Sequence, residues 1–383
     1  MNQHMRPDPV PFIDLAAQRR RLGSAIDVAT KRVLDHCQFI SGPEVAQLES
    51  MLAAYCGARH VITCANGTDA LVMVLMAIGV GRGDAIFCPS FTFCATASPV
   101  ARTGATPLFV DVDETTFNMT RASLERGIAT ARRLGLKPRA VIPVDLFGQS
   151  VDHDAIGDLA RAEGLFILDD AAQGFGATYN GRRLGTLADA TTTSFFPAKP
   201  LGCYGDGGAI FTEDDNLAST LRSIRVHGQG SDKYDNVRLG MTGRLDTIQA
   251  AVLIEKLKIF DDEIEARNKV AERYTRGLGN DVVAPRVASG NTSVWAQYTI
   301  RLPAGVDRDG FAAALKAQGV PTAIYYAKSL HQQTAFREFP VADGGLPTCE
   351  MLSDDVISLP MHAYLDEPTQ ERVIKAVRDA LSS

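Results

Sequence analysis

The sequence predicts an α/β fold, with a large unit built on a mostly parallel sheet that carries helices on both faces, followed by a smaller α+β unit. Short β-rich runs alternate with helical patterns through the first two thirds of the chain, and this alternation is typical of parallel sheets. Near residue 294 the pattern changes to one alternating strand and separate helices, which indicates a second unit. The glycine-rich run at 205–208 leads into a strand instead of following one, so it is not a dinucleotide-binding fingerprint.

Composition narrows the class of protein. The chain has 383 residues, and 45% of them are hydrophobic, which is ordinary for a globular protein with a sizeable core. A net charge of −6 argues against a general nucleic-acid binder, which would carry a basic surface. With no run of about 18 apolar residues and no signal-peptide core, we expect no membrane segment and a cytoplasmic protein.

The 7 cysteines are scattered and the 7 histidines have no ligand spacing, which predicts reduced thiols and no metal site.

The N-terminal part of the chain predicts packing helices and then a candidate anion site. Apolar residues recur at helical spacing over 15–34, and a second helix spans 43–57. A β-rich run at 60–65 breaks at 66–69 into an apolar helix over 70–78. A strand, a small-residue turn and a helix N-terminus form an anion site, because free N–H groups and the helix dipole point at one spot. A simple capped turn is the open alternative for this stretch alone.

Two of the next strands bring candidate functional residues to their carboxyl ends. The strand at 85–90 ends in Phe91-Thr92-Phe93, where ligands bind in open α/β sheets, so an aromatic here is a candidate cover for a cofactor ring. Core packing is the alternative. The strand at 165–168 leads into Asp169-Asp170, a carboxylate pair that needs a partner such as a protonated pyridine nitrogen. One of the two could instead cap the following turn. The intervening strands are expected at 106–112 and 139–144.

A single lysine, Lys199, stands between two prolines in the run 194–202. Pro197 and Pro200 fix φ and lack an N–H, so they disfavour a regular element and hold the lysine in a defined loop. Apolar neighbours lower the pKa of a lysine because desolvation disfavours its charged form, and a neutral amine attacks a carbonyl. The carbonyl that suits such a lysine is that of pyridoxal 5′-phosphate, and the alternative is a surface lysine in a turn.

The rest of the chain is expected to complete the sheet and form the second unit. One long helix over 245–278 is expected to cross from the large unit to the small one. We therefore expect a cofactor-binding large domain with N-terminal helices at 1–250 and a small α+β domain at 251–383. The other expected elements are a strand at 209–212, a helix at 216–226, a loop at 279–293, a strand at 294–302, a helix ending at Gly319, an extended segment at 320–326 and a last helix at 367–381.

Five short motifs carry a resemblance to a known family. They are Asn66-Gly67-Thr68-Asp69-Ala70, Phe91-Thr92-Phe93-Cys94-Ala95-Thr96-Ala97, Asp169-Asp170-Ala171-Ala172-Gln173, Ser194-Phe195-Phe196-Pro197-Ala198-Lys199 and Gly240-Met241-Thr242-Gly243-Arg244-Leu245-Asp246. In this order, and across nearly the whole chain, they resemble the DegT/StrS family of sugar-nucleotide aminotransferases. The resemblance implies the aspartate-aminotransferase fold, called fold type I, and a homodimer whose active sites are shared between subunits.

The resemblance also implies roles for individual residues. Lys199 would bind pyridoxal phosphate covalently and then move the proton, and Asp170 would bind the pyridine nitrogen. An ionised aspartate suits this role because it keeps the pyridinium protonated, so that the ring draws electrons from the substrate. The other implied cofactor contacts are the ring hydroxyl for Gln173, the ring face for Phe93, and the phosphate for Gly67, Thr68 and Ser194.

Residues near the substrate show two departures from the family's pattern. Many relatives have an asparagine where Thr242 stands, which reaches the phosphate from the neighbouring subunit, and a threonine is a shorter donor. Tyr325 and Tyr326 replace a His-Tyr pair that is common in relatives, and we take both as candidate substrate residues. Arg244 matches a family arginine at the substrate site.

The segment 199–209 is similar to that of relatives that aminate C3 of a hexose. We expect the acceptor UDP-2-acetamido-2-deoxy-3-keto-glucuronate and the donor L-glutamate, in bacterial lipopolysaccharide or O-antigen synthesis. The alternatives are a neutral 3-keto-6-deoxy or 4-keto nucleotide sugar, or a non-catalytic regulatory protein of the same fold. A sugar carboxylate and a diphosphate require cationic side chains. The candidates are Arg244, Arg238, Lys233 and Lys328.

Overall fold

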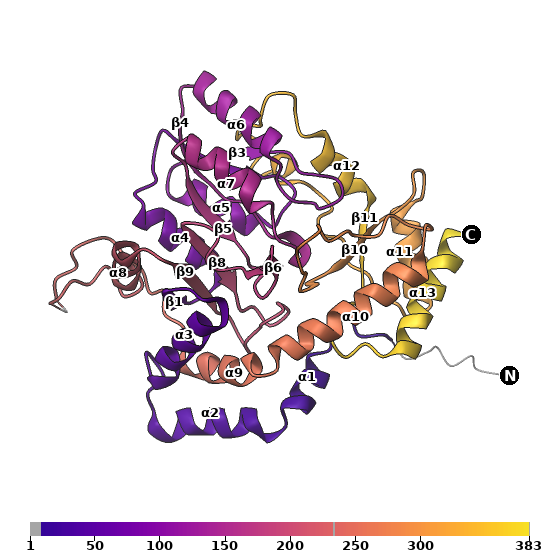
Figure 1. Ribbon diagram of the computed structural model, residues 1–383, viewed down its shortest axis with the longest axis horizontal. Helices are drawn as coiled ribbons and strands as arrows, with labels where there is room; N and C mark the ends of the chain where they lie inside the picture. The colour runs from indigo at the N-terminus through magenta and orange to yellow at the C-terminus, as the bar shows by residue number, and fades with distance from the viewer. Residues whose placement is uncertain (1–8, 233, 383) are drawn as a thin grey trace.

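A seven-stranded mixed sheet forms the centre of the computed structural model, which describes residues 9–232 and 234–382 (Figure 1). Within these residues, six strands of the sheet run in one direction and β9 runs against them. The prediction of a mostly parallel sheet is confirmed. In spatial order the strands are β1 (His60–Cys64), β9 (Gly208–Thr212), β8 (Ala190–Ser194), β5 (Phe166–Asp170), β4 (Lys137–Val141), β2 (Asp84–Pro89) and β3 (Thr106–Val110).

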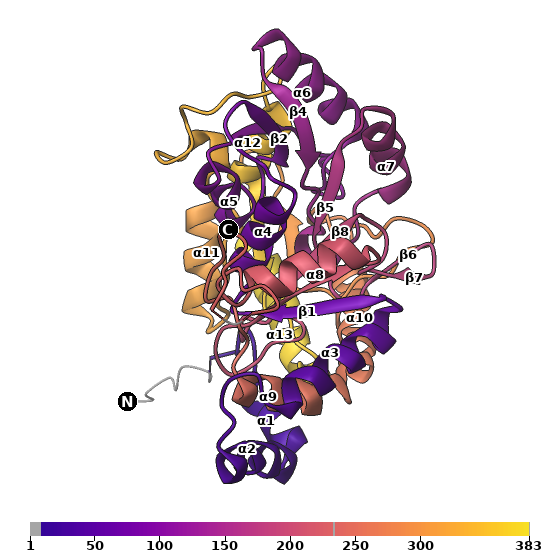
Figure 2. The same cartoon turned by 90° about the vertical axis from the view of Figure 1, so that its left-hand side faces the viewer.

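Helices cover both faces of this sheet. Successive residues of a strand point to opposite sides, and here the residues on both sides are apolar and need to be covered. In β2, Ile86 and Cys88 belong to the core under one helical layer, whereas Phe87 belongs to the core under the other. Figure 2 shows α5 and α7 on opposite sides of the strands. One layer contains α4 (Gly67–Ala77), α5 (Ser98–Arg102) and α8 (Asp215–Ile224), and the other contains α3 (Pro43–Cys56), α6 (Arg121–Arg133), α7 (His153–Ala162) and α9 (Thr247–Leu257).

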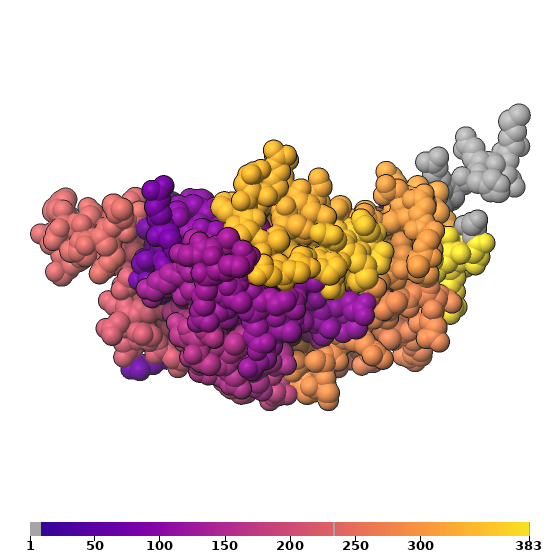
Figure 3. All heavy atoms as spheres, turned by 90° about the horizontal axis from the view of Figure 1, so that it is seen from above, coloured from indigo at the N-terminus to yellow at the C-terminus, as the bar shows by residue number. Residues whose placement is uncertain are grey.

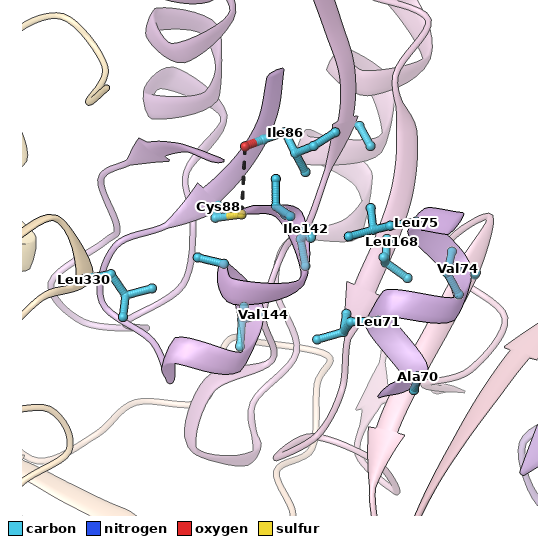
Figure 4. Close-up of a cluster of buried hydrophobic side chains, with 14 of the residues drawn as sticks. Ala70, Leu71, Val74, Leu75, Ile86, Cys88, Ile142, Val144, Leu168 and Leu330 are labelled. Carbon is cyan, nitrogen blue, oxygen red and sulfur yellow. Dashed lines mark hydrogen bonds between the residues drawn. The ribbon is translucent and has the colours of Figure 1, made fainter. Parts of the chain in front are cut away.

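The core between α4 and the sheet is shown in Figure 4. Leu71 and Val74 of α4 are buried in one cluster with Ile142 and Leu168. Each such side chain contributes roughly 1.5–3 kcal/mol when it is fully buried. Leu330, from the C-terminal third of the chain, belongs to the same cluster, so this part of the chain packs directly on the core of the large unit.

The helical pattern predicted at 15–34 forms two helices. These are α1 (Leu15–Leu22) and α2 (Ser24–His36), and Gly23 between them has a φ of 55°. This positive φ lies outside the helical region and suits glycine, so α1 ends there.

The prediction of one continuous helix at 245–278 is wrong. The chain forms α9 and then α10 (Phe260–Leu278), with a turn at Lys258. Helix α9 packs on α2 and α3, whereas α10 packs on α13 (Glu367–Leu381). Because the two halves pack on different partners, the helix axis changes direction without a proline or glycine.

The C-terminal unit contains an antiparallel pair, β10 (Tyr298–Arg301) and β11 (Val356–Leu359). The strand predicted at 294–302 is shorter than expected because the N–H of Val294 donates to Gly148 O instead of to a neighbouring strand. The described residues 320–326 form no strand, and Ala323 makes a single bridge to Ser358. The elements not predicted in detail are α12 (Pro347–Asp355), β11, the hairpin of β6 (Thr178–Tyr179) and β7 (Arg182–Arg183), and the short helices η1 (Cys94–Thr96), η2 (Leu146–Gly148) and η3 (Leu330–Gln332).

The last helix, α13, is confirmed at its predicted bounds because Asp366 caps it by accepting the N–H of Thr369. The helix that ends before Gly319 is α11 (Arg308–Ala317). The domain division between residues 250 and 251 stays a prediction. Across the described residues, no helix is both long enough and apolar enough to cross a membrane.

Candidate active site

The predicted site residues gather where several strands end. Strands β1, β5 and β8 run in the same direction, so their carboxyl ends lie at one edge of the sheet. Asp170 is the last residue of β5 and Ser194 is the last residue of β8. The turn that follows β1 leads directly into α4. Ligands of open α/β sheets bind at this edge.

The N-terminus of α4 lies close to Ser194, and we call the backbone around Gly67 and Ser194 the cradle. Gly67 is the first residue of α4, and a Cβ there would lie 2.7 Å from the Cβ of Ser194. A Cβ on Gly208 would lie 2.6 Å from the carbonyl carbon of Asn66. Both glycines are therefore required by the close approach of the chain. With Thr68 at its second position, this helix start brings together the residues predicted to bind a phosphate.

Asp170 is buried and held by two donors. Its exposed fraction is 5%, Thr96 Oγ1 donates to its Oδ2 at 2.9 Å, and the N–H of Ala172 donates to its Oδ1 at 3.2 Å. Burial raises the pKa of Asp170, and these hydrogen bonds and the charge of Lys199 partly offset that rise. Two fixed donors orient the carboxylate, so its remaining lone pairs can accept a hydrogen bond from a protonated ring nitrogen.

Lys199 lies in the loop that leaves β8. Its backbone N–H donates to Phe196 O at 2.8 Å, and the N–H of Cys203 donates to Phe195 O at 2.8 Å, which closes the loop. Burial lowers the pKa of Lys199, and the negative charge of Asp170 opposes this effect. The defined loop and the lowered pKa were both predicted. A larger neutral fraction makes the amine a better nucleophile toward a carbonyl.

Gln173, Tyr326 and Phe93 form a second group. Gln173 Oε1 accepts the N–H of Phe147 at 2.8 Å, and Gln173 Nε2 donates to Tyr326 Oη at 3.0 Å. The rings of Phe93 and Tyr326 have centroids 6.3 Å apart and an interplanar angle of 32°. Phe93 is 52% exposed, so its ring offers a flat apolar face to a ligand. Tyr325 packs edge-on against Tyr326 with centroids 5.7 Å apart.

Thr242 and Arg244 lie on a segment that passes beside the end of β1. Gly243 O accepts the N–H of Ala65 at 3.1 Å. Thr242 Oγ1 forms a hydrogen bond with His227 Nε2 at 3.0 Å, and no motif or spacing in the sequence pointed to this histidine. Arg244 is partly buried, and its Nε has no hydrogen-bond partner among the described residues. This buried nitrogen therefore lacks an acceptor from the described part of the chain.

The other predicted cations lie apart from this group. Arg238 lines a separate hollow against α4 and α8 whose lining includes no other predicted site residue. Lys328 is exposed. Lys233 lies outside the described residues.

The residues at this edge fit pyridoxal phosphate. The cradle at Gly67 and Ser194 suits a phosphate, Lys199 is an amine with a lowered pKa, and Asp170 is an oriented carboxylate. These residues would hold the cofactor, which supplies an electron-withdrawing ring for moving an amino group. A mostly parallel sheet with this site at its carboxyl edge defines a fold type I pyridoxal-phosphate enzyme.

Comparisons with known proteins identify the family. The model of the DegT/DnrJ/EryC1/StrS aminotransferase family matches residues 21–378. The UDP-2-acetamido-2-deoxy-3-oxo-D-glucuronate aminotransferase of Pseudomonas aeruginosa is 48% identical over 93% of this chain and 96% of its own. A DegT/DnrJ/EryC1/StrS aminotransferase structure from Brucella abortus is 51% identical with a TM-score of 0.95, covering 97% of this chain and 99% of that one. The Bacillus subtilis protein NtdA, with bound cofactor PMP, is 27% identical with a TM-score of 0.90, covering 100% and 87%.

The chain belongs to the DegT/DnrJ/EryC1/StrS aminotransferase family and is a pyridoxal-phosphate-dependent aminotransferase. The predicted family, fold type, cofactor and enzyme class are confirmed. The family match and the aminotransferase relative argue against a non-catalytic regulatory protein. The charges of Lys199 and Asp170 act on one another, as expected if the two residues serve one site. The roles given to single site residues stay predictions.

Proposed function

We propose that this enzyme transfers the amino group of L-glutamate to C3 of UDP-2-acetamido-2-deoxy-3-keto-glucuronate, in bacterial lipopolysaccharide O-antigen synthesis. The observation that carries the proposal is the 48% identity to the Pseudomonas aeruginosa aminotransferase named for this keto sugar acid. That similarity extends over 93% of this chain, so it is not confined to one domain.

In this proposal Lys199 transfers protons at carbon atoms, and Asp170 keeps the ring nitrogen protonated. The Lys199 amine, whose pKa burial lowers, removes a proton from the amino-acid carbon and later delivers a proton to C3 of the sugar. Asp170 holds a proton at the pyridine nitrogen. Phe93 covers the ring, and Gln173, fixed by Phe147 and Tyr326, orients it. Glutamate leaves as 2-oxoglutarate, and the sugar ketone becomes an amine.

Arg244 supports an acidic sugar over a neutral one. Its Nε lacks a hydrogen-bond partner among the described residues, and a buried guanidinium nitrogen without an acceptor is costly. The carboxylate of a uronic acid supplies two acceptor oxygens in the geometry that arginine prefers. A neutral 3-keto-6-deoxy or 4-keto sugar has no carboxylate for it.

We also propose a cytoplasmic homodimer with shared active sites. The segment after α8, of which the structure describes residues 225–232 and 234–239, projects from the body of the molecule at the left of Figures 1 and 3. On this segment Val237 is 54% exposed and Leu239 is 87% exposed, and exposed apolar side chains on a projection suit contact with a second copy. Thr242 and Arg244 follow directly, so docking would bring them toward the partner's site. The free cysteines suit a reducing compartment.

The deciding experiment offers the 3-keto uronic acid, a neutral 3-keto-6-deoxy sugar and a 4-keto sugar, each as a nucleotide derivative with L-glutamate, and follows 2-oxoglutarate. We expect the uronic acid to have the highest kcat/KM. Arg244→Gln should lower kcat/KM for the uronic acid by roughly 10–100-fold, as expected for a lost charged hydrogen bond, and should affect the neutral sugar little. Arg244→Lys is the matched control that keeps the charge. Faster turnover of the neutral 3-keto-6-deoxy sugar or of the 4-keto sugar by the unaltered enzyme would contradict the proposed substrate.

A further inference from the structure

Asp145, Asp169 and His153 form a closed group of ionisable side chains next to Asp170. One ring nitrogen of His153 and one carboxylate oxygen of each aspartate lie within 4.8 Å of one another. Asp145 and Asp169 are fully buried, and His153 is 7% exposed. The N–H of Asp145 donates to Asp170 O at 3.1 Å, which fixes the group to the end of β5.

Each carboxyl group has one oxygen with a donor and one without. Asp145 Oδ1 accepts the N–H of Val151 at 2.8 Å, and Asp169 Oδ2 accepts from Thr191 Oγ1 at 3.3 Å. Asp145 Oδ2 and Asp169 Oδ1 have no hydrogen-bond partner among the described residues, and neither does His153 Nε2. Buried acceptors of this kind are rarely left without a donor. A proton on one carboxyl group would supply that donor to the other.

His153 does not neutralise the pair. Burial lowers the pKa of His153 to about 4, so its ring is uncharged at neutral pH. Its Nε2 lies 3.9 Å from Asp145 Oδ1, which is too far for a hydrogen bond. Burial raises the pKa of both Asp145 and Asp169, and the neighbouring charge of Asp170 adds to the rise.

We propose that Asp145 and Asp169 share one proton, and that the single negative charge they keep acts on the cofactor ring through Asp170. Adjacent buried carboxyl groups cannot both ionise without strong repulsion. The retained charge raises the proton affinity of Asp170 and of the ring nitrogen that Asp170 binds. Asp145 and Asp169 are positioning residues in this scheme, because they reach the reacting atoms only through Asp170. This inference depends on the binding of pyridoxal phosphate and not on the identity of the sugar substrate. Its failure would therefore leave the proposed substrate unaffected.

Other ionisable groups lie near the pair and near His153. Asp170 lies on β5 and is itself influenced by Lys199. His153 lies at the start of α7. The charges of Asp152, Asp154 and Arg182 act on the pKa of His153.

Infrared spectroscopy of the holoenzyme labelled with carboxyl-¹³C aspartate measures the shared proton directly. At neutral pH the unaltered enzyme should show one protonated-carboxyl band that shifts with the label. The band should remain in Asp170→Asn and disappear in both Asp145→Asn and Asp169→Asn, because an amide then donates to the remaining carboxylate. A spectrum of the unaltered enzyme without this band would overturn the proposal, even if a variant failed to fold.

The pH titration of the visible absorbance of the bound cofactor measures the charge. Each single Asn variant keeps one negative charge and one donor, so its midpoint should match that of the unaltered enzyme. The double variant Asp145→Asn/Asp169→Asn removes the charge, and its midpoint should fall by about one pH unit. Asp158→Asn, which removes an exposed charge on α7, is the control and should not shift.

Three results would contradict the shared proton or its effect on the cofactor. A midpoint shift in the single variants would mean that both carboxyl groups are ionised. No shift in the double variant would mean that both are protonated or that the charge does not act on the cofactor. A stoichiometric divalent metal ion in the unaltered holoenzyme, lost from both single variants, would mean that the group is a metal site.

Discussion

Thr96 Oγ1 donates a 2.9 Å hydrogen bond to Asp170 Oδ2 across 74 residues of sequence. Thr96 ends η1, and its hydroxyl also pairs with Thr92 Oγ1 at 3.2 Å. Both threonines are buried, so water cannot replace them easily. The orientation of the carboxylate predicted to bind the pyridine nitrogen therefore depends on a short helix between β2 and α5.

Replacing Thr96 by valine should lower kcat/KM about tenfold, because Asp170 loses a donor and hydrogen bonds to charged groups are worth about 1.5–3 kcal/mol. Valine keeps the shape of threonine, so folding should change little. Steady-state kinetics and the cofactor spectrum of Thr96→Val measure the effect. Thr96→Ser keeps the hydroxyl and is the control. Equal activity of the valine variant and the unaltered enzyme would show that this hydrogen bond does not matter for catalysis.

Lys199 should be the lysine that binds the cofactor. The purified protein should absorb visible light, and borohydride should fix the cofactor to the chain at this residue. Peptide mapping of the adduct tests the prediction, and an adduct at Lys256, another lysine with a lowered pKa, would contradict it. Lys199→Ala should abolish turnover and leave circular dichroism unchanged, because the side chain contributes more to chemistry than to packing.

Asp170→Asn should lower kcat by a factor of 100 or more, in line with loss of a group that stabilises charge in the transition state, while the cofactor stays bound. An amide does not hold the pyridine nitrogen in its protonated form. The comparison is Asp169→Asn, one residue earlier and also buried, which should be mild. Stopped-flow spectra of each half-reaction separate chemistry from binding. If Asp169→Asn lowered kcat more than Asp170→Asn, Asp169 would be the residue that binds the pyridine nitrogen.

The sequence predicted the elements whose signals are local. The helix at 367–381 matched α13 because Asp366 is a capping residue that stands directly before it. The candidate anion site was inferred from a turn of small residues between a strand and a helix. Gly67 in that turn lies close to Ser194, and phosphate binding there stays a prediction. The loop around Lys199 and its lowered pKa were predicted because two prolines and apolar neighbours surround it in sequence.

The features that the sequence did not predict depend on contacts between distant residues. The turn at Lys258 has no proline or glycine, and only the separate packing of α9 and α10 explains it. The donors to Asp170 and Gln173 come from Thr96 and Phe147, which belong to other strand-to-helix connections. No periodicity or spacing rule brings such residues together.

Gly67→Ala should weaken cofactor binding and destabilise the protein by about 1–3 kcal/mol, the usual effect of overpacking. The new Cβ would lie 2.7 Å from the Cβ of Ser194, so α4 or β8 must move and the cradle must widen. Titration with the cofactor and thermal denaturation measure both effects. Gly81→Ala is the control, because a Cβ at Gly81 meets no atom within 4 Å. Equal cofactor affinity in the two variants would argue against a phosphate site at Gly67.

Subunit mixing tests whether Arg244 serves the site of the partner subunit. Lys199→Ala and Arg244→Ala enzymes should each be nearly inactive on the proposed uronic acid substrate. If each site combines Lys199 of one subunit with Arg244 of the other, a mixed dimer contains one site with both residues intact. Because half of the dimers are mixed at random exchange and each has one intact site, about a quarter of the activity of the unaltered enzyme should return.

The control for this experiment is a demonstration of exchange, for example by mass spectrometry of differently tagged subunits. A double variant that carries both substitutions in one chain, mixed with the unaltered enzyme, should give mixed dimers without an intact site, because each site then contains one altered residue. If exchange occurs and the single variants recover no activity, Arg244 acts in its own subunit, where Gly243 O already accepts the N–H of Ala65 at the end of β1. The unpartnered Nε of Arg244 would then face a ligand within one chain, and the projecting segment after α8 would contribute to assembly alone.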